Sequence, residues 1–147
     1  MADYDSLKKQ IEGDILNSSF DRGRYATDAS IYQIMPEAVM VPKTWQDVEA
    51  ALDFAKAEGI SLLPRGGGTS QSGQTVNNAL VIDFTKHLNK ILDYDADAGT
   101  VRVQPGLVLD NLNRQLKSDG WWYPVDVSTA SRATLGEIGR ASCRERV

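Results

Sequence analysis

The stretch LLPRGGGTSQSGQ, from Leu62 to Gln74, holds the residue types best suited to chemistry. Three consecutive glycines follow a short apolar run, with Arg65 before them and the hydroxyls of Thr69 and Ser70 behind. Glycine adds no side chain to a core and costs conformational entropy, so the cluster indicates a backbone that another group must approach closely. Successive backbone N–H groups in such a loop can form an anion-binding concavity. The stretch therefore predicts a phosphate-type site, with a plain glycine-rich surface turn as the alternative.

Two familiar phosphate-binding patterns fit this stretch poorly. A P-loop needs a lysine followed by Ser or Thr after its last glycine, whereas TSQSGQ follows here. A dinucleotide-binding βαβ turn needs G-x-G-x-x-G running into a helix, with an acidic residue about 20 positions further on. The residues after Gly68 carry no apolar helical face. An anion-binding loop of another kind is the hypothesis that is left.

The hydrophobic pattern predicts a mixture of helices and strands around this loop. Thr44 and Asp47 have the spacing of a capping box, and Gly59 can end the helix that they begin. That helix is expected to bury Trp45, Val48, Leu52 and Ala55. The order of the helices and strands along the chain favours an α+β domain. The predicted elements are helices over 3–17, 43–59 and 107–120, strands over 37–42, 60–65, 79–84 and 121–125, and a hairpin over 91–106.

Composition limits the kinds of protein that this chain can be. Its 147 residues, 41% of them hydrophobic, suit one globular domain or part of one. A net charge of −4 predicts no general affinity for nucleic acid or an anionic membrane. A single cysteine excludes a disulfide framework. The residues 1–16 lack the apolar core that a signal peptide has, and no apolar run approaches the roughly 20 residues of a membrane span. We expect a cytoplasmic chain without a transmembrane segment.

The last residues, EIGRASCRERV (137–147), differ in style from the rest of the chain. They show no clean periodicity, and they contain three arginines and the only cysteine, Cys143. They resemble the translation of a common sequencing adapter and no protein family. We therefore expect the natural sequence to end near Gly136 and treat 137–147 as a non-native tail. A genuine arginine-rich terminus is the alternative.

Four motifs in order resemble one family: PRGGGTS, LVIDFTKHLNKIL, VRVQPGLVLDNLNRQL and PVDVSTASRATLG. They are similar to the PCMH-type FAD-binding domain of the vanillyl-alcohol-oxidase class, shared by FAD-linked glycolate, D-lactate and D-2-hydroxyglutarate dehydrogenases. The opening RYATDASIYQIMPEAVMVPKTWQDV resembles the large members, which are fused to an iron–sulfur module. The resemblance runs from about Arg24 to Gly136. It implies an α+β fold with the N-terminal subdomain and the start of the second subdomain.

The resemblance also implies an organisation into parts. Residues 1–35 would form an N-terminal helix and lead-in segment, and residues 36–136 an incomplete FAD-binding domain. After ATLG the family pattern continues with a second glycine, whereas this sequence has Glu137. The flavin site would therefore be unfinished, and we assign no catalytic residue.

The family's cofactor contacts carry over onto the matching residues, and FAD is expected to bind non-covalently. Val41 and Pro42 would lie near the adenine, and Pro105 and Gly106 would shape the wall of the flavin groove. The pyrophosphate would be wrapped by the glycine loop, with the last two residues continuing along the cofactor: Arg65, Gly66, Gly67, Gly68, Thr69, Ser70, Gly73 and Gln74. A segment of small residues would pass along the pyrophosphate and isoalloxazine: Asp126, Ser128, Thr129, Ala133, Thr134 and Gly136.

The activity implied is an oxidoreductase that oxidises a D-2-hydroxy acid such as lactate, glycolate or 2-hydroxyglutarate. Hydride would pass to flavin N5, and electrons would leave to an iron–sulfur cluster in the missing C-terminal part or to another non-NAD acceptor. This fragment alone would be inactive. Two alternatives stay open: a nucleotide- or anion-binding module without redox chemistry, and an inactive truncated fragment.

Three other groups of residues could carry chemistry. His87 is the only histidine, and we interpret it as an ordinary surface or strand-end residue. The aromatic run 121–123 could stack on a cofactor, but core or interface packing is favoured. The alternating Asp93, Asp95 and Asp97 fail the EF-hand pattern at Ala98, so no metal site is predicted.

Overall fold

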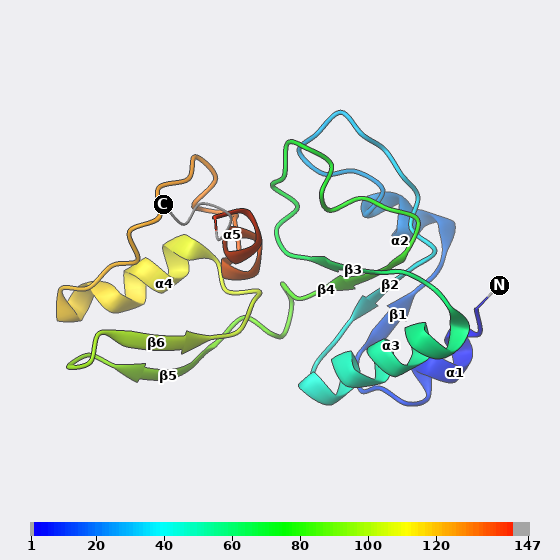
Figure 1. The fold of residues 1–147 in the computed structure, drawn as a ribbon, viewed down its shortest axis with the longest axis horizontal. Coiled ribbons are helices and arrows are strands. Elements are labelled where there is room, and N and C mark those ends of the chain that lie inside the picture. The colour runs from blue at the N-terminus through cyan, green and yellow to red at the C-terminus, as the bar shows by residue number, and fades with distance from the viewer. Residues whose placement is uncertain (1, 143–147) are drawn as a thin grey trace.

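The computed structural model describes residues 2–142, which form two lobes side by side (Figure 1). The N-terminal lobe is built on a four-stranded sheet, and the second lobe on a two-stranded hairpin covered by helices. The chain crosses from one lobe to the other after the last strand of the first sheet. The mixed α and β architecture predicted from the sequence is confirmed. No helix among residues 2–142 has the length and apolarity needed to cross a membrane.

The sheet of the N-terminal lobe has the order β1-β2-β4-β3, with β1 antiparallel to β2 and the other pairs parallel. Every residue of β2 and β4 is buried, as is usual for parallel strands covered on both faces. One face packs Met40 and Leu80 against helices α1 and α3. The elements of this lobe are α1 (Tyr4–Lys8), β1 (Asp14–Leu16), α2 (Ser19–Arg24), β2 (Ala38–Val41), α3 (Trp45–Glu58), β3 (Leu62–Arg65) and β4 (Leu80–Asp83).

The second lobe has two small cores on either side of helix α4. Leu112 and Leu116 pack against the hairpin, and Leu109 packs with Ala133 and Ile138. The elements are β5 (Ile91–Asp95), β6 (Thr100–Val103), α4 (Leu109–Leu116), the 3-10 helix η1 (Lys117–Asp119) and α5 (Leu135–Ser142). The predicted hairpin and the predicted helix are thus confirmed.

The helix predicted over 3–17 is wrong. Helix α1 ends at Lys8, and Asp14–Leu16 is an edge strand paired with β2. The reason is Gly13, where the chain passes so close to β2 that a Cβ would collide with the carbonyl oxygen of Val41. Ile15 is therefore buried by sheet pairing and not by a helical face.

The prediction for helix α3 is correct in its ends and only partly correct in its buried face, where Ala55 alone of the four expected residues is buried. Thr44 and Asp47 form the capping box, and Gly59 ends the helix at φ 67°. The buried face is Asp47, Ala51, Phe54 and Ala55, whereas Trp45 and Leu52 are 44% and 54% exposed.

Two further segments differ from the predictions, and a third contains part of the expected tail. Residues 121–125 form no strand and run as an irregular segment after η1. Helix α2 lies in a region for which no helix was predicted. Ser18 caps it by accepting a hydrogen bond from the backbone N–H of Asp21 at 3.1 Å. Helix α5 includes the start of the segment that we expected to be a non-native tail. The rest of that segment, 143–147 with Cys143, lies outside the described residues.

Gly106 is a point of close contact beside the connection between the lobes. It is buried, its N–H donates to the carbonyl of Leu88 at 2.9 Å, and a Cβ would collide with the carbonyl oxygen of Phe84. We expect Gly106→Ala to lower the free energy of unfolding by about 2–3 kcal/mol, since the colliding atoms are backbone and cannot rotate away. Thermal or urea unfolding would measure this. The control is Gly23→Ala in α2, where a Cβ meets nothing within 4 Å; equal stability of the two variants would contradict the prediction.

Candidate cofactor site

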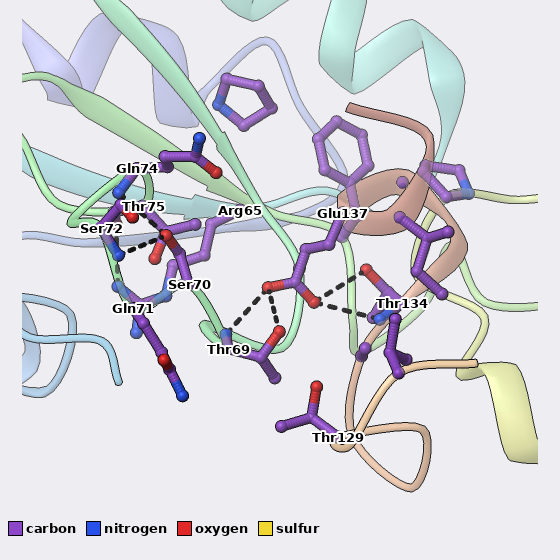
Figure 2. Close-up of a pocket in the computed structure, with 18 of the residues that line it drawn as sticks. Arg65, Thr69, Ser70, Gln71, Ser72, Gln74, Thr75, Thr129, Thr134 and Glu137 are labelled. Carbon is purple, nitrogen blue, oxygen red and sulfur yellow. Dashed lines mark hydrogen bonds between the residues drawn. The ribbon is translucent and has the colours of Figure 1, made fainter. Parts of the chain in front are cut away.

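A cavity of about 540 Å³ lies between the lobes, in the size range of small-molecule sites. The end of β3 and the loop after it form one wall, and Pro105 with parts of 127–138 form the other. Figure 2 shows the polar groups of this cavity, with Glu137 lying between Thr69 and Thr134. Residues from segments far apart in the sequence therefore meet around one space.

The glycine loop presents backbone donors to an anionic group. The carboxylate of Glu137 accepts hydrogen bonds from the backbone N–H of Gly67 at 2.7 Å and of Thr69 at 3.0 Å. It also accepts one from the backbone N–H of Thr134 at 3.0 Å. We call these three N–H groups the cradle. The loop predicted to bind an anion through its backbone thus holds a carboxylate in this way.

The cradle requires glycine because the two walls of the cavity touch there. Gly68 has a φ of 69°, a conformation that residues with a Cβ rarely adopt. A Cβ on Gly67 would collide with the carbonyl oxygen of Arg132 in the opposite wall. A close approach of the kind inferred from the sequence is therefore present, and its partners are the backbone of Arg132 and the side chains of Thr134 and Glu137.

Arg65 supports the glycine loop through hydrogen bonds to neighbouring backbone. Its guanidinium donates to the carbonyl oxygens of Tyr25, Thr27 and Thr75, at 3.2, 2.7 and 3.0 Å. It also lies over the Tyr25 ring, 5.3 Å from the centroid. Burial lowers the pKa of Arg65, and the negative charge of Asp28 opposes that shift. The sequence assigned Arg65 to the pyrophosphate, whereas the structure engages its donors with the backbone that supports the loop.

Asp28 was not predicted as a site residue, yet it fixes the far end of the loop. Its carboxylate accepts hydrogen bonds from the hydroxyl of Thr75 at 2.9 Å and from the backbone N–H of Ser30 at 2.9 Å. Burial raises the pKa of Asp28, but hydrogen bonds from Ser30 and Thr75 outweigh it, so the pKa lies below its ordinary value. No local pattern in the sequence joins Asp28 to Thr75, which lies 47 positions away.

Part of the cavity lining is apolar. Trp45 and Phe84 form a tilted aromatic pair with ring centroids 6.3 Å apart, and both line the cavity with Pro64, Pro105 and Ile138. Such walls suit a planar aromatic group. The sequence had placed Trp45 in the core; its 44% exposure follows from its position beside this space.

The structure brings most of the predicted cofactor residues to the cavity. Those that line it are Arg65, Gly66, Thr69, Ser70, Gln74, Pro105, Thr129, Ala133, Thr134 and Gly136. Others lie nearby without lining it: Gly67, Gly68, Gly73, Gly106, Asp126 and Ser128. Val41 and Pro42 are buried at the end of β2 and do not reach it. The other lining residues, which the sequence did not assign to the cofactor, are Trp45, Pro64, Gln71, Ser72, Thr75, Phe84, Val127, Glu137 and Ile138.

The remaining candidates lie away from this site. His87 does not line the cavity. Trp121 packs on Gly99 at the hairpin turn and donates from Nε1 to the carbonyl of Ala96 at 3.1 Å. Asp95 accepts a turn hydrogen bond from the backbone N–H of Ala98 at 2.9 Å. Within residues 2–142, no three His, Cys, Asp or Glu side chains are grouped as metal ligands.

Known proteins are similar to this chain in sequence and in fold. Residues 36–138 match the FAD binding domain family. The chain is 42% identical to D-2-hydroxyglutarate dehydrogenase of Haemophilus influenzae over 139 residues, which is 91% of this chain and 14% of that enzyme. It is 35% identical to glycolate oxidase subunit GlcD of Bacillus subtilis, over 82% of this chain and 26% of that subunit.

Solved structures agree on the fold. An alkyldihydroxyacetonephosphate synthase superposes with a TM-score of 0.81 over 92% of this chain and 28% of that chain, at 21% identity. The chain thus spans only a small part of the proteins that it matches. The fold predicted from the sequence motifs is confirmed, and the chain belongs to the FAD binding domain family.

Proposed function

We propose that this chain supplies the pyrophosphate-binding part of the FAD site in a D-2-hydroxyacid dehydrogenase. The proposal is supported above all by one observation: the backbone N–H groups of Gly67, Thr69 and Thr134 all donate to one anionic group, the carboxylate of Glu137. Relatives named D-2-hydroxyglutarate dehydrogenase, glycolate oxidase subunit and D-lactate dehydrogenase support the reaction class. In the whole protein, electrons would pass to an iron–sulfur or other non-NAD acceptor.

The residues that line the cavity or lie beside it suit both the phosphates and the ring system of FAD. The cradle offers charge-assisted hydrogen bonds to phosphate oxygens, and the Trp45–Phe84 wall offers apolar surface to a ring system. When bound, the flavin supplies the hydride acceptor for oxidation of the hydroxy acid. The chain's own residues would bind and orient the cofactor: the cradle at its phosphates, with Arg65 and Asp28 holding the loop in place.

We further propose that the cofactor is held without a covalent bond, in a cytoplasmic enzyme. The glycine loop contains no histidine or cysteine, and His87 does not line the cavity. We also propose that the chain has three parts. Residues 1–35 are an N-terminal helix and lead-in segment, residues 36–136 belong to the FAD-binding domain, and residues 137–147 are a non-native tail. The family match over 36–138 supports the start of that division.

Binding of FAD compared with riboflavin tests the proposed function directly. Both ligands would be titrated into the purified chain, with flavin fluorescence as the readout. We expect FAD to bind at least about tenfold more tightly than riboflavin, because only FAD carries the pyrophosphate that the cradle would bind. Equal binding of the two flavins, or binding of neither, would contradict the proposal.

A nucleotide- or anion-binding module without redox chemistry is the second candidate, because the cradle by itself selects only an oxyanion. ADP separates the two functions, since it has the pyrophosphate but no flavin. ADP binding as tight as FAD binding would favour this alternative. Tighter FAD binding would favour the dehydrogenase, because the apolar lining residues Trp45 and Phe84 would then contribute to the affinity.

A further inference from the structure

A second cavity, of about 720 Å³, lies beside the glycine loop. Gly67 of the loop and Thr134 both line it, and helix α4 forms another wall. The helix contributes Asn111, Arg114 and Gln115, which lie three and four positions apart and so share one face. Of the residues that line the cofactor cavity, only Thr134 lines this one as well. The two cavities are therefore neighbouring but distinct spaces.

The lining of this second cavity carries positive charge without negative charge. Arg114 comes from α4, and Arg132 comes from the segment before α5. Within residues 2–138, no Asp or Glu side chain lines the cavity, although the chain has 20 acidic residues against 16 Lys and Arg. Asp110, on the same helix as Arg114, is exposed and lies outside the lining. A hollow with two guanidinium groups and no carboxylate favours an anionic ligand.

Both guanidinium groups can be reached by a ligand. Arg114 and Arg132 are exposed, and the ion pairs formed among residues 2–138 involve other cations. Arg114 donates from Nη1 to Oδ1 of Asn111 at 3.2 Å, which engages one of its five N–H groups. Most of the donor capacity of this pair is therefore left for another molecule.

The carboxamides of the lining are already engaged with backbone. Nδ2 of Asn89 donates to the carbonyl oxygen of Thr85 at 2.8 Å. Nε2 of Gln115 donates to the carbonyl oxygen of Asn111 at 3.2 Å. These amides fix the shape of the walls, so the two arginines are the groups that would select the ligand.

We propose that this cavity binds a small anion that carries phosphate or carboxylate groups, through Arg114 and Arg132. A guanidinium presents its N–H groups as a planar fork that matches both kinds of oxyanion. The volume lies in the range of small-molecule sites, so the oxyanion would be part of a small molecule. The inference goes beyond the proposed function and does not require FAD, and both arginines lie before the segment 137–147.

Calorimetric titration of the purified chain with inorganic phosphate and with glutarate tests this site, since the two probes carry the two candidate groups. Ionic strength is held constant, because salt screens exposed charges. We expect the better probe to bind with a dissociation constant below about 1 mM. That constant is expected to rise at least about tenfold in Arg114→Gln and in Arg132→Gln, because each loses a charge-assisted contact. Arg102→Gln is the matched control, since Arg102 is exposed on β6 and lies outside both cavities.

The cradle could itself attract phosphate, so the titrations are repeated with saturating FAD. We expect binding of the probe to persist, and we expect Arg114→Gln to keep the FAD affinity of the wild type. If the chain binds no FAD, the proposed function fails, whereas the two arginine variants still decide this inference. Thermal unfolding of each protein checks that the variants fold, as the exposure of both arginines leads us to expect.

The relative affinities of the probes identify the source of the anion. Tighter binding of phosphate would assign a phosphorylated ligand, tighter binding of glutarate a dicarboxylate, and equal binding the oxyanion chemistry that they share. Binding of neither probe would overturn the site. So would equal affinities of the arginine variants and the Arg102 control, or a loss in Arg114→Gln that is confined to FAD.

Discussion

Replacing Asp47 with alanine is expected to lower the free energy of unfolding by about 3–5 kcal/mol, because three backbone donors would lose their acceptor. The carboxylate is 2% exposed. It accepts from the backbone N–H groups of Glu12 at 2.9 Å, Lys43 at 2.7 Å and Thr44 at 3.2 Å. Its loss would release the start of helix α3 and the turn before β1 together.

Urea unfolding of Asp47→Ala measures this effect, with Asp53→Ala as the matched control. Asp53 is exposed on the same helix, so its loss is expected to change stability by less than about 0.5 kcal/mol. Similar stability of the two variants would show that the buried hydrogen bonds contribute little.

The same carboxylate gives stability a dependence on pH. Burial raises the pKa of Asp47, but the hydrogen bonds from Glu12, Lys43 and Thr44 outweigh that effect and hold it below the ordinary value of 3.8. A pKa lower in the folded state means that the contribution is complete above the unfolded-state pKa. It is lost as the pH falls through the folded-state value. Asp47→Asn should therefore flatten the acid limb of the stability curve.

Asp47 also shows what the sequence could and could not predict. The capping box with Thr44 is a local pattern, and it was predicted from four residues. The bond to Glu12 joins positions 35 apart, and no spacing rule connects them. This distant bond is one reason why α1 ends at Lys8, because Asp47 of α3 and the pairing with β2 hold the segment that follows the helix. The spacing of four residues between Leu7, Ile11 and Ile15 is by itself that of one continuous helix.

The candidate site likewise has parts that could be predicted from the sequence and parts that could not. The glycine loop could be predicted because its composition departs from that of a core or an ordinary helix. The role of Arg65 could not, since its acceptors are backbone carbonyls, which leave no trace in side-chain identity. Glu137 was set aside because the sequence assigned 137–147 to a non-native tail, and its bonds to Gly67 and Thr69 join positions 70 and 68 apart.

Replacing Gly66 with alanine is expected to raise the dissociation constant for FAD at least about tenfold, the loss of roughly one charge-assisted hydrogen bond. Gly66 lines the cavity where its two walls meet. A Cβ there would collide with Oγ1 of Thr134 and lie 2.9 Å from Cγ of Glu137. The Glu137 side chain can move, but Thr134 is fully buried. The wall carrying one of the three cradle donors would therefore have to shift.

Flavin-fluorescence titration of Gly66→Ala, with Gly23→Ala as the control, measures that loss. Thermal unfolding of each protein shows whether the change is confined to the site, since a local shift of 134–137 should cost less stability than the backbone collision at Gly106. FAD affinity equal to that of the Gly23 control would mean that the spacing of the walls does not determine binding, and that the cradle adjusts to its ligand.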